Sequence, residues 1–410
     1  MLASIGLTLP FPRMAGFRKL CSGEDAQNAL TVSVATTASQ ILALKADWLA
    51  LEDEADGVLL FQSFFWIENA LRHAGENAGF QPFVLTARRG GRLTALLPLK
   101  RIRKNGMDVL TGLSEPYQQY TDMLIAPNTD GTSVFCAWRK ALSDCGADYV
   151  HFGQVRNGGP LFDAIKGLVP PSGERDAAPF VQLSDWPDFE SYYGSLRSKT
   201  RKNMRNARNR LNREAPLKHG VFRDRTSVAS IIDRTFEDRS AWLERMGLTS
   251  RAFDDADFEA FLERLKDRAG ERGDAGDFET LGFCLMHGDT PISEQWGFLH
   301  RGRYYAFMSG WDPAYEQASP GKLHLADVLE CCFELSADAA DFMIPAVPYK
   351  MTYAADAIGV QDHILTLTLR GMIYNRVWLN GLRSGAKKLF FRLPPSIRGI
   401  VLRLAGRQGP

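Results

Sequence analysis

The strongest constraint on the fold of this 410-residue chain is an alternating stretch at residues 292–308 that is followed by a helix start. Apolar and polar residues alternate on both sides of a Gly turn, a pattern typical of two antiparallel strands. Ser319, Pro320 and Gly321 then precede a segment at residues 320–335 with helical periodicity. The pattern predicts a β-meander that leads directly into a helix.

The predicted helix start has the features of an anion site. Ser319 suits the N-cap, and Pro320 suits the first helical position, where a missing N–H costs nothing. Gly321 allows a ligand to approach the backbone closely. The free N–H groups and the positive end of the helix dipole favour a pyrophosphate, although an ordinary capped helix is the alternative.

Length and element order together predict a duplicated fold. A chain of 410 residues is too long for one ordinary core. Residues 31–183 and 184–370 each show helices, a meander, a further helix and a strand, so we expect two domains of an internally duplicated α/β (α+β) fold. Residues 1–30 are expected to be poorly ordered, and residues 371–410 form a basic helical tail.

Local periodicity places the individual elements. The Pro/Gly-rich stretch at residues 169–179 reads as an irregular connection between the domains, and Gly194 interrupts the longest helix. Helices are expected at residues 40–54, 63–74, 134–144, 188–213, 228–244 and 255–268, and strands at residues 83–88, 93–101, 148–153, 279–286, 292–300, 304–309, 341–344 and 364–369.

Composition excludes several classes of protein. The six cysteines form no CxxC pair and have no His partners at metal spacing, so we expect reduced thiols, a cytoplasmic protein and no metal site. No run of about 18 apolar residues predicts a membrane-spanning helix. The N-terminal residues do not read as a signal peptide, and there is no Gly-x-Ser-x-Gly elbow for Ser/His/Asp catalysis.

Three passages taken together carry a family resemblance. They are residues 61–66 with the Leu-Leu-Pro-Leu of residues 96–99, the Arg-rich segment 196–211, and residues 309–321 followed by 341–343 and 348–350. Their order and spacing resemble the GNAT-like acyltransferases of the cellulose-biosynthesis CelD/BcsL type. These are relatives of the FemABX aminoacyltransferases, which consist of two GNAT domains.

The resemblance implies a duplicated GNAT-like fold with central mixed sheets flanked by helices, and acetyl-CoA or another acyl-CoA as co-substrate. Two departures are visible. Ile-Pro-Ala at residues 344–346 replaces the family's usual Arg-Gly-Asp-like step, and the strict GNAT pyrophosphate loop is absent, with Gln317 to Gly321 in its place. The first departure leaves the acceptor open.

Two acidic residues are candidates for the general base. Glu294 shares a predicted strand face with Ile292, Trp296 and Phe298, and burial there would raise its pKa toward the range that a base needs. A solvated strand face is the alternative for Glu294. Asp312 follows the next strand and is the second candidate, with turn formation as its alternative.

The remaining site residues follow from the resemblance. Tyr349 and Lys350 resemble the family's Tyr-Lys pair, in which Tyr would protonate the leaving thiolate and Lys would hold a phosphate or carboxylate. The expected cofactor cradle consists of Gln317, Ser319, Gly321, Lys322 and His324, and the expected substrate contacts are Trp296, Trp311, Lys350, Arg201 and Arg205.

Positive charge is concentrated in two segments. The Arg-rich segment 196–211 suits an anionic partner such as the coenzyme phosphates, an anionic glycan or lipid, or an RNA, with a solvated helix face as the alternative. Residues 363–410 contain nine Lys/Arg and no Asp/Glu. Their apolar residues predict either an interfacial helix or a helix packed on the catalytic domain.

These observations lead to one hypothesis with two rivals. The chain is expected to be a cytoplasmic acyltransferase, free or peripheral at the inner membrane, that acylates an amine or hydroxyl of a saccharide or envelope precursor by direct attack. An aminoacyl-tRNA-dependent transferase of the FemABX kind is the less favoured alternative. The second rival is a non-catalytic GNAT-like binding module.

Overall fold

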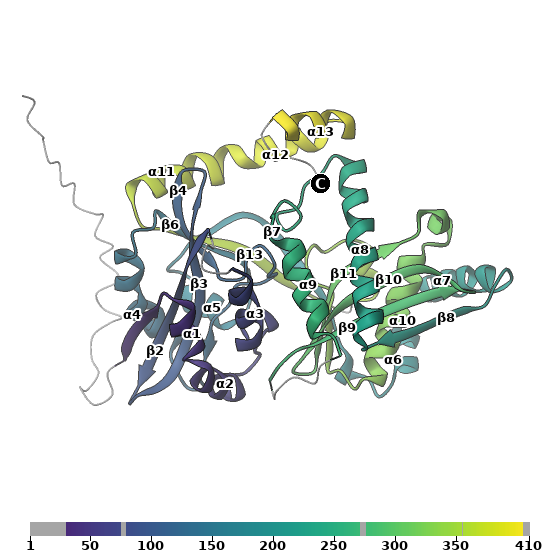
Figure 1. Cartoon of the computed structure of the whole chain (residues 1–410), viewed down its shortest axis with the longest axis horizontal. Coiled ribbons are helices and arrows are strands. Elements are labelled where there is room, and N and C mark those ends of the chain that lie inside the picture. Colours follow the sequence, from purple (N-terminus) through teal and green to yellow (C-terminus); the bar gives the residue numbers. More distant parts are fainter. Residues whose placement is uncertain (1–29, 75–78, 271–275, 355, 405–410) are drawn as a thin grey trace, which may run out of the picture.

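The computed structural model describes residues 30–74, 79–270, 276–354 and 356–404. One mixed sheet runs through both halves of this part of the chain, and helices pack on its faces (Figure 1). The strand order is β1-β2-β3-β4-β6-β13-β7-β12-β11-β10-β9-β8, and β5 pairs with β3. The expected α/β class with a duplicated order of elements is therefore confirmed.

The first unit contains three helices, a meander, two further helices and two long strands. Its elements are β1 (Thr31–Ala35), α1 (Ala38–Leu42), α2 (Lys45–Glu54), η2 (Leu60–Gln62), α3 (Phe64–Ala74), β2 (Phe80–Arg89), β3 (Arg92–Lys104), β4 (Met107–Gly112), β5 (Leu124–Ile125), α4 (Gly131–Asp144), β6 (Tyr149–Arg156), α5 (Pro160–Ile165) and β7 (Pro171–Gln182).

The second unit repeats this order and is followed by a helical tail. Its elements are η3 (Leu183–Asp185), α6 (Phe189–Ser195), α7 (Ser198–Asn212), β8 (Leu217–Phe222), α8 (Arg225–Met246), α9 (Phe258–Arg268), β9 (Glu279–His287), β10 (Thr290–His300), β11 (Arg303–Trp311), η4 (Pro313–Ala318), α10 (Pro320–Glu334), β12 (Ala339–Asp341), η5 (Lys350–Thr352), β13 (Asp356–Thr366), α11 (Leu369–Tyr374), η6 (Asn375–Leu382), α12 (Arg383–Arg392) and α13 (Pro395–Leu404).

Two of the local predictions are wrong for long-range reasons. Residues 169–179 mostly belong to β7, because hydrogen bonds to β13 outweigh the local Pro and Gly content. The strand expected at residues 341–344 ends at Asp341, whose carboxylate accepts the Met343 N–H at 2.8 Å. Met343 has a φ of 55°, which interrupts the strand.

The last strand of the second unit lies in the sheet of the first. β13 is antiparallel to β6 on one side and to β7 on the other, and β7 continues the sheet to β12. A boundary at residue 183 therefore divides the chain but not the sheet. Side chains from β6 and β13, which are far apart in the sequence, become neighbours.

Buried contacts join the two units into one body. The carboxylate of Asp341, which is fully buried, accepts hydrogen bonds from Tyr120 at 2.9 Å and from Arg156 at 3.2 Å. In the shared core, the rings of Trp66 and Phe298 pack edge to face with centroids 5.1 Å apart. Direct contacts thus join the two units that form the walls of the cavity described below.

Candidate active site

A cavity of about 640 Å³ lies between the two units. The second unit contributes β11, the segment that follows β12, and the segment that follows α8. The first unit contributes the segment after β4, the middle of β6, and Asp362, which β13 carries into it. Pockets where separate units meet are common positions for ligand sites.

On the side of the second unit, β11 presents an open edge to this cavity. β11 pairs with β12 only from Arg303–Ala339 to Tyr305–Asp341, whereas its other edge pairs with β10 as far as Trp311. Residues 306–309 then line the cavity together with Phe342. Peptide groups on this edge have no strand partner, so they are available to a ligand that carries amides.

The start of α10 keeps its anion-binding character, although Ser319 does not cap it as expected. Ser319 has a φ of 52°, and its side chain makes no capping hydrogen bond. The first turn contains no acidic residue, and Lys322 is exposed. A Cβ added to Gly321 would lie 3.5 Å from Trp311, an ordinary contact that leaves the approach open. Gln317 is exposed in η4, immediately before this turn.

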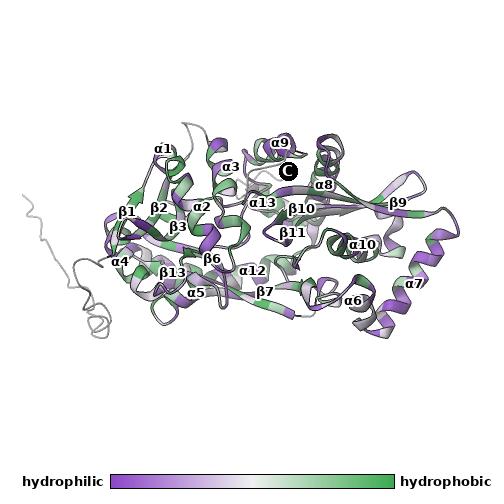
Figure 2. Cartoon of the chain, turned by 90° about the horizontal axis from the view of Figure 1, so that it is seen from below, coloured by the Kyte–Doolittle hydropathy of each residue, from purple (hydrophilic) through white to green (hydrophobic). Residues whose placement is uncertain are grey.

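The basic helix α7, the strongly hydrophilic helix in Figure 2, contacts α10. The Tyr353 hydroxyl contacts both Met204 of α7 and the carbonyl of Lys322, so the two helices meet near the start of α10. Arg201 and Arg205 lie within three residues of Met204 on α7. Three of the predicted cationic residues therefore belong to two helices that meet near this helix start.

Glu294, the first candidate for the base, is buried in an ion pair outside the cavity lining. Arg234 of α8 donates two hydrogen bonds to its carboxylate, one of them 2.6 Å from Nε to Oε2. Its carboxylate is therefore bonded to a guanidinium group and is not presented to the cavity. Glu294, Trp296 and Phe298 share a strand face as expected, but Ile292 does not, because a bulge between Pro291 and Ser293 turns it into the opposite core.

Asp312 performs the turn role that was its alternative, since its carboxylate accepts the Ala314 N–H at 2.9 Å. Asp238 of α8, which the sequence did not single out, lies near it. Burial raises the pKa of Asp238, and the charges of Glu294 and Asp312 add to this. A Cβ on Gly310 would lie 2.5 Å from a carboxylate oxygen of Asp238, so this side chain packs closely over Gly310.

Three other predicted residues occupy different environments. Trp296 is fully buried and donates a hydrogen bond to Thr235 at 2.9 Å, so it is a core residue and not a substrate contact. His324 faces the sheet, 3.1 Å from Ser293, and burial lowers its pKa to about 3. It is therefore neutral and turned away from the helix start. Trp311 is 39% exposed.

Tyr349 and Lys350 both line the cavity, as their predicted roles require. Burial raises the pKa of Tyr349, which therefore keeps its proton. Burial also lowers the pKa of Lys350 to about 8, although the carboxylates of Asp341 and Asp176 raise it. The Lys350 ammonium donates a hydrogen bond to a backbone carbonyl at 3.0 Å.

The opposite wall carries a His–Asp pair that the sequence analysis missed. His151 Nε2 lies 3.0 Å from Asp362 Oδ2, and the other carboxylate oxygen accepts the Gln154 N–H at 2.8 Å. Burial alone would raise the pKa of Asp362, but the hydrogen bond and charge of His151 outweigh it and hold the pKa at about 2. An ionised carboxylate thus orients an imidazole at the cavity.

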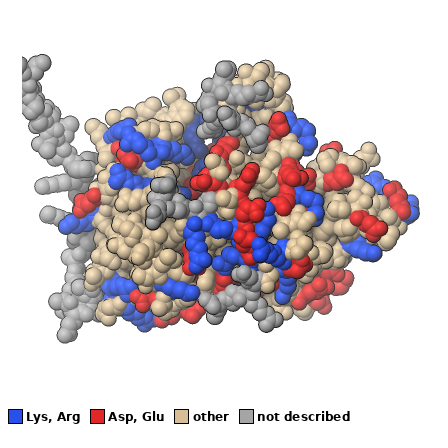
Figure 3. All heavy atoms as spheres, in the orientation of Figure 1, with Lys and Arg blue, Asp and Glu red and all other residues tan. Residues whose placement is uncertain are grey.

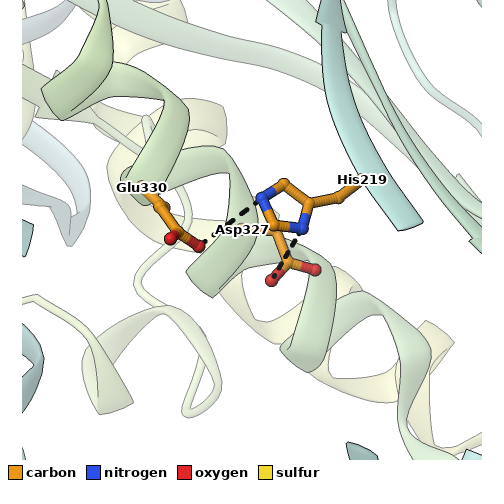
Figure 4. A group of neighbouring side chains, drawn as sticks. All are labelled: His219, Asp327 and Glu330. Atoms are coloured by element: carbon orange, nitrogen blue, oxygen red, sulfur yellow. Dashed lines mark ion pairs between the residues drawn. The ribbon is translucent and has the colours of Figure 1, made fainter. Parts of the chain in front are cut away.

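A second polar group lies between α7, β8 and α10 (Figure 4). His219 stands between Asp327 and Glu330, at 3.8 Å and 3.5 Å, and one ligand atom from each residue lies within 4.8 Å of the others. Arg208 forms an ion pair with Asp327, so a cation is already in place. The group is therefore an ion-pair network that fastens α7 to α10, and the absence of a metal site stays a prediction.

Comparison with known proteins identifies the second unit. Residues 198–351 match the sequence model of a family described as "Acetyltransferase (GNAT) domain". This segment begins with α7 and ends immediately after Lys350, so it contains the open edge of β11 and the start of α10. The GNAT part of the resemblance is confirmed for this segment, whereas the narrower CelD/BcsL type stays a prediction. No curated protein sequence matches the chain.

The fold is similar to that of several solved structures. The crystal structure of FemX superposes with a TM-score of 0.52 at 11% identity, covering 81% of this chain and 98% of that one. A conserved protein of unknown function from Bacteroides thetaiotaomicron VPI-5482 gives 0.50 at 10% identity, with 82% and 100% covered. A tandem GNAT protein from the clavulanic acid biosynthesis pathway gives 0.46 at 12% identity, with 82% and 99% covered.

Proposed function

We propose that this protein is an acyltransferase that moves an acyl group, most simply acetyl, from an acyl-CoA to an amine or hydroxyl of a saccharide or envelope precursor. The observation that carries this proposal is the open edge of β11, which connects the cavity with the uncapped start of α10 inside the GNAT segment. Donor and acceptor would meet in one ternary complex, where positioning supplies much of the rate.

The residues around α10 fit the donor. Its phosphates would lie on the N–H groups at Gly321, with Lys322, Arg201 and Arg205 supplying positive charge. The amides of the pantetheine arm would bond to the open edge of β11 at residues 306–309. The thioester would then reach the cavity between the units, where the acceptor binds.

His151 is the best-placed base in the cavity. It stands on the wall of the first unit, and Asp362 fixes its ring. Glu294 is the weaker choice because Arg234 occupies its carboxylate, and Asp312 because it caps a turn. A base must reach the acceptor proton before its pKa matters.

The proposed step is a direct displacement at the thioester carbonyl. The acceptor O–H or N–H attacks the carbonyl carbon, His151 takes its proton, the C–S bond breaks, and Tyr349 donates its proton to the leaving sulfur. Tyr349 is suited to this role because burial keeps it protonated. Lys350, with a pKa of about 8, adds positive charge beside the developing negative charge.

Thermal unfolding with coenzyme A and with acetyl-CoA tests the donor. A ligand at 100 times its Kd contributes about 2.7 kcal/mol, which raises Tm by several degrees. Gly321→Phe should fold, because a side chain has room there, and should lose the shift. No shift at millimolar ligand would refute acyl-CoA binding and favour the non-catalytic binding module.

Transfer to a panel of sugars and amino sugars, followed by mass spectrometry, tests the base. His151→Gln should keep the acetyl-CoA shift in Tm and lower transfer by about 100-fold or more. Asp362→Asn should lower it by less and move the pH profile, because the imidazole would lose its orienting charge. Full transfer by His151→Gln would rule out this residue as the base.

The tRNA-dependent alternative is supported by α7, which carries six Lys/Arg and no acidic residue. Binding of RNA to such a helix would weaken steeply as salt increases. Filter binding of total tRNA between low and physiological salt separates the two proposals. Tight binding that competes with acetyl-CoA would favour the tRNA-dependent transferase.

A further inference from the structure

The helical tail, residues 369–404, exposes an unusual amount of apolar surface. Of the 14 large apolar side chains that are exposed in the described chain, 11 belong to the tail. Leu369, Ile373 and Val377 recur every four residues, are each more than half exposed, and form an apolar groove with Met107. Contiguous surface of this kind marks an interaction site.

The tail is also cationic throughout. Residues 369–404 contain eight Lys/Arg and no Asp/Glu. The rest of the visible surface differs. On the face shown in Figure 3, positive and negative side chains alternate across the middle of the molecule, and ion pairs such as Lys266–Asp233 join α8 to α9. The tail thus combines most of the exposed large apolar side chains of the described residues with charge of a single sign.

Both ends of the tail are anchored, so its surface is preformed. At the first unit, Arg370 donates to the Gly106 carbonyl at 2.7 Å, and the ring of Tyr374 stacks on Tyr149. At the second unit, α13 packs on α8, and Arg398 donates to the Met246 carbonyl at 3.3 Å. Between these points almost every described side chain of α12 is exposed.

We propose that the tail binds the surface of an anionic lipid bilayer. No helix in the described parts of the chain is long and apolar enough to cross a membrane, so the contact would be interfacial. Charge complementarity favours anionic headgroups, and exposed apolar residues beside cations are typical of interfacial helices. Trp378, which is 41% exposed, suits the headgroup region.

The same contact would bring the cavity close to the membrane. α13 meets α8 at its C-terminal end, and residues 250–253, which follow that end, line the cavity. If the proposed acyl transfer holds, the acceptor would be an envelope precursor carried by the bilayer. Binding to vesicles does not depend on that transfer, so the two proposals fail separately.

Cosedimentation of the full chain with vesicles tests the proposal. Wild type should bind vesicles of equal parts phosphatidylglycerol and phosphatidylcholine, and should not bind phosphatidylcholine alone. The triple variant R383E/K388E/R392E should bind at least about 100-fold more weakly, since each cation near the surface contributes about fivefold. Ile373→Gln with Val377→Gln should weaken binding without changing net charge.

Matched variants elsewhere give the controls. R210E/R213E/K218E changes the net charge equally at exposed sites at the C-terminal end of α7 and in β8. Leu42→Gln removes an exposed apolar side chain from the first unit. Both should bind like wild type. Equal loss in the charge control, equal binding to both vesicle types, or no binding to either would overturn the proposal. All variants should keep the acetyl-CoA shift in Tm.

Discussion

The two units share one arrangement, yet the gap beside the last meander strand is filled in the first unit and open in the second. In each unit the last strand of the meander is parallel to the strand after the next helix, and in each the pairing is short. β4 and β6 pair only at Val109–Tyr149 and Leu110–Val150. β11 and β12 pair at three positions. Beyond these pairs both strand pairs separate.

In the first unit, side chains fill the gap. Gln118 bonds to the hydroxyls of Ser114 and Thr121, each at 2.9 Å, and the Thr121 N–H bonds to the Gly153 carbonyl. A Cβ on Gly112 would meet Gln118 at 2.0 Å, so the space is full. The corresponding space in the second unit is part of the cavity.

The helix that follows the meander is capped by a side chain in the first unit (α4) but not in the second (α10). Asp130 caps α4, and its carboxylate accepts the N–H groups of Thr132 and Ser133. Ser319 leaves the start of α10 without a side-chain cap. The Asp130 carboxylate thus occupies the helix start in the first unit, whereas the start of α10 in the second unit is left for an anionic group of a ligand. Duplicating a fold does not duplicate a site, because a few side chains decide whether the shared frame is open.

The largest expected effect concerns the joint between the units. Burial raises the pKa of Glu52 to about 7, even though the Phe64 N–H and Arg301 of the second unit oppose this. The pKa of Glu52 is therefore higher in the folded protein than in the unfolded chain. As a result, the free energy of unfolding is highest below about pH 4.5 and decreases as the pH rises to 7. The loss is about 3 kcal/mol.

Glu52→Gln should remove this loss. Urea unfolding should find wild type and variant alike at pH 5, and the variant about 2 to 3 kcal/mol more stable at pH 8. Asp122, whose pKa burial raises to about 6, contributes to both proteins and cancels in the difference. The same difference in stability between wild type and variant at both pH values would mean that Glu52 is solvated at the contact between the units.

Gln118, which fills the gap in the first unit, should contribute to the stability of the fold but not to acetyl-CoA binding. Gln118→Ala removes several buried hydrogen bonds and should lower the free energy of unfolding by about 2 to 3 kcal/mol. The increase in Tm with acetyl-CoA should persist. If that increase disappeared, the donor would bind in the first unit and the comparison would be reversed.

Transferring the first unit's cap to the second should close its anion site. Ser319→Asp places a carboxylate where the donor phosphates are proposed to lie, and should weaken acetyl-CoA binding by about 10- to 100-fold. The unliganded protein should be at least as stable, because Asp is a good cap. Asp130→Ser is the reciprocal control and should leave acetyl-CoA affinity unchanged.

The smallest expected effect comes from α7. Arg201→Gln and Arg205→Gln should each weaken acetyl-CoA binding by about threefold to fivefold at low salt, and by less at high salt. Arg210→Gln, on the same helix but farther from Met204, should have no effect. Titration calorimetry at two salt concentrations measures all three. Equal effects at the three positions would indicate that the positive charge of α7 as a whole, and not the position of Arg201 and Arg205, attracts the ligand.

Alternation and helical periodicity are local, and they predicted the second unit well. The meander at residues 279–309 and the helix after Pro320 lie close to where the structure has them. Tyr349 and Lys350 line the cavity, and Gly321 lies at the start of α10. The meander and the helix start depend on neighbours within a few residues, which a sequence displays directly, whereas Tyr349 and Lys350 were selected through the family resemblance.

What the sequence did not display depends on long-range pairing. His151 and Asp362 are 211 residues apart and meet because β13 enters the first unit's sheet. Arg234 pairs with Glu294 because α8 packs on β10. Gln118 fills the gap in the first unit, whereas the corresponding gap in the second unit stays open. The sequence by itself determined the elements, their duplicated order and the start of α10. Only the tertiary structure decided that Glu294 pairs with an arginine, that the gap in the second unit is open and that His151 faces the cavity. These features follow from contacts between distant segments.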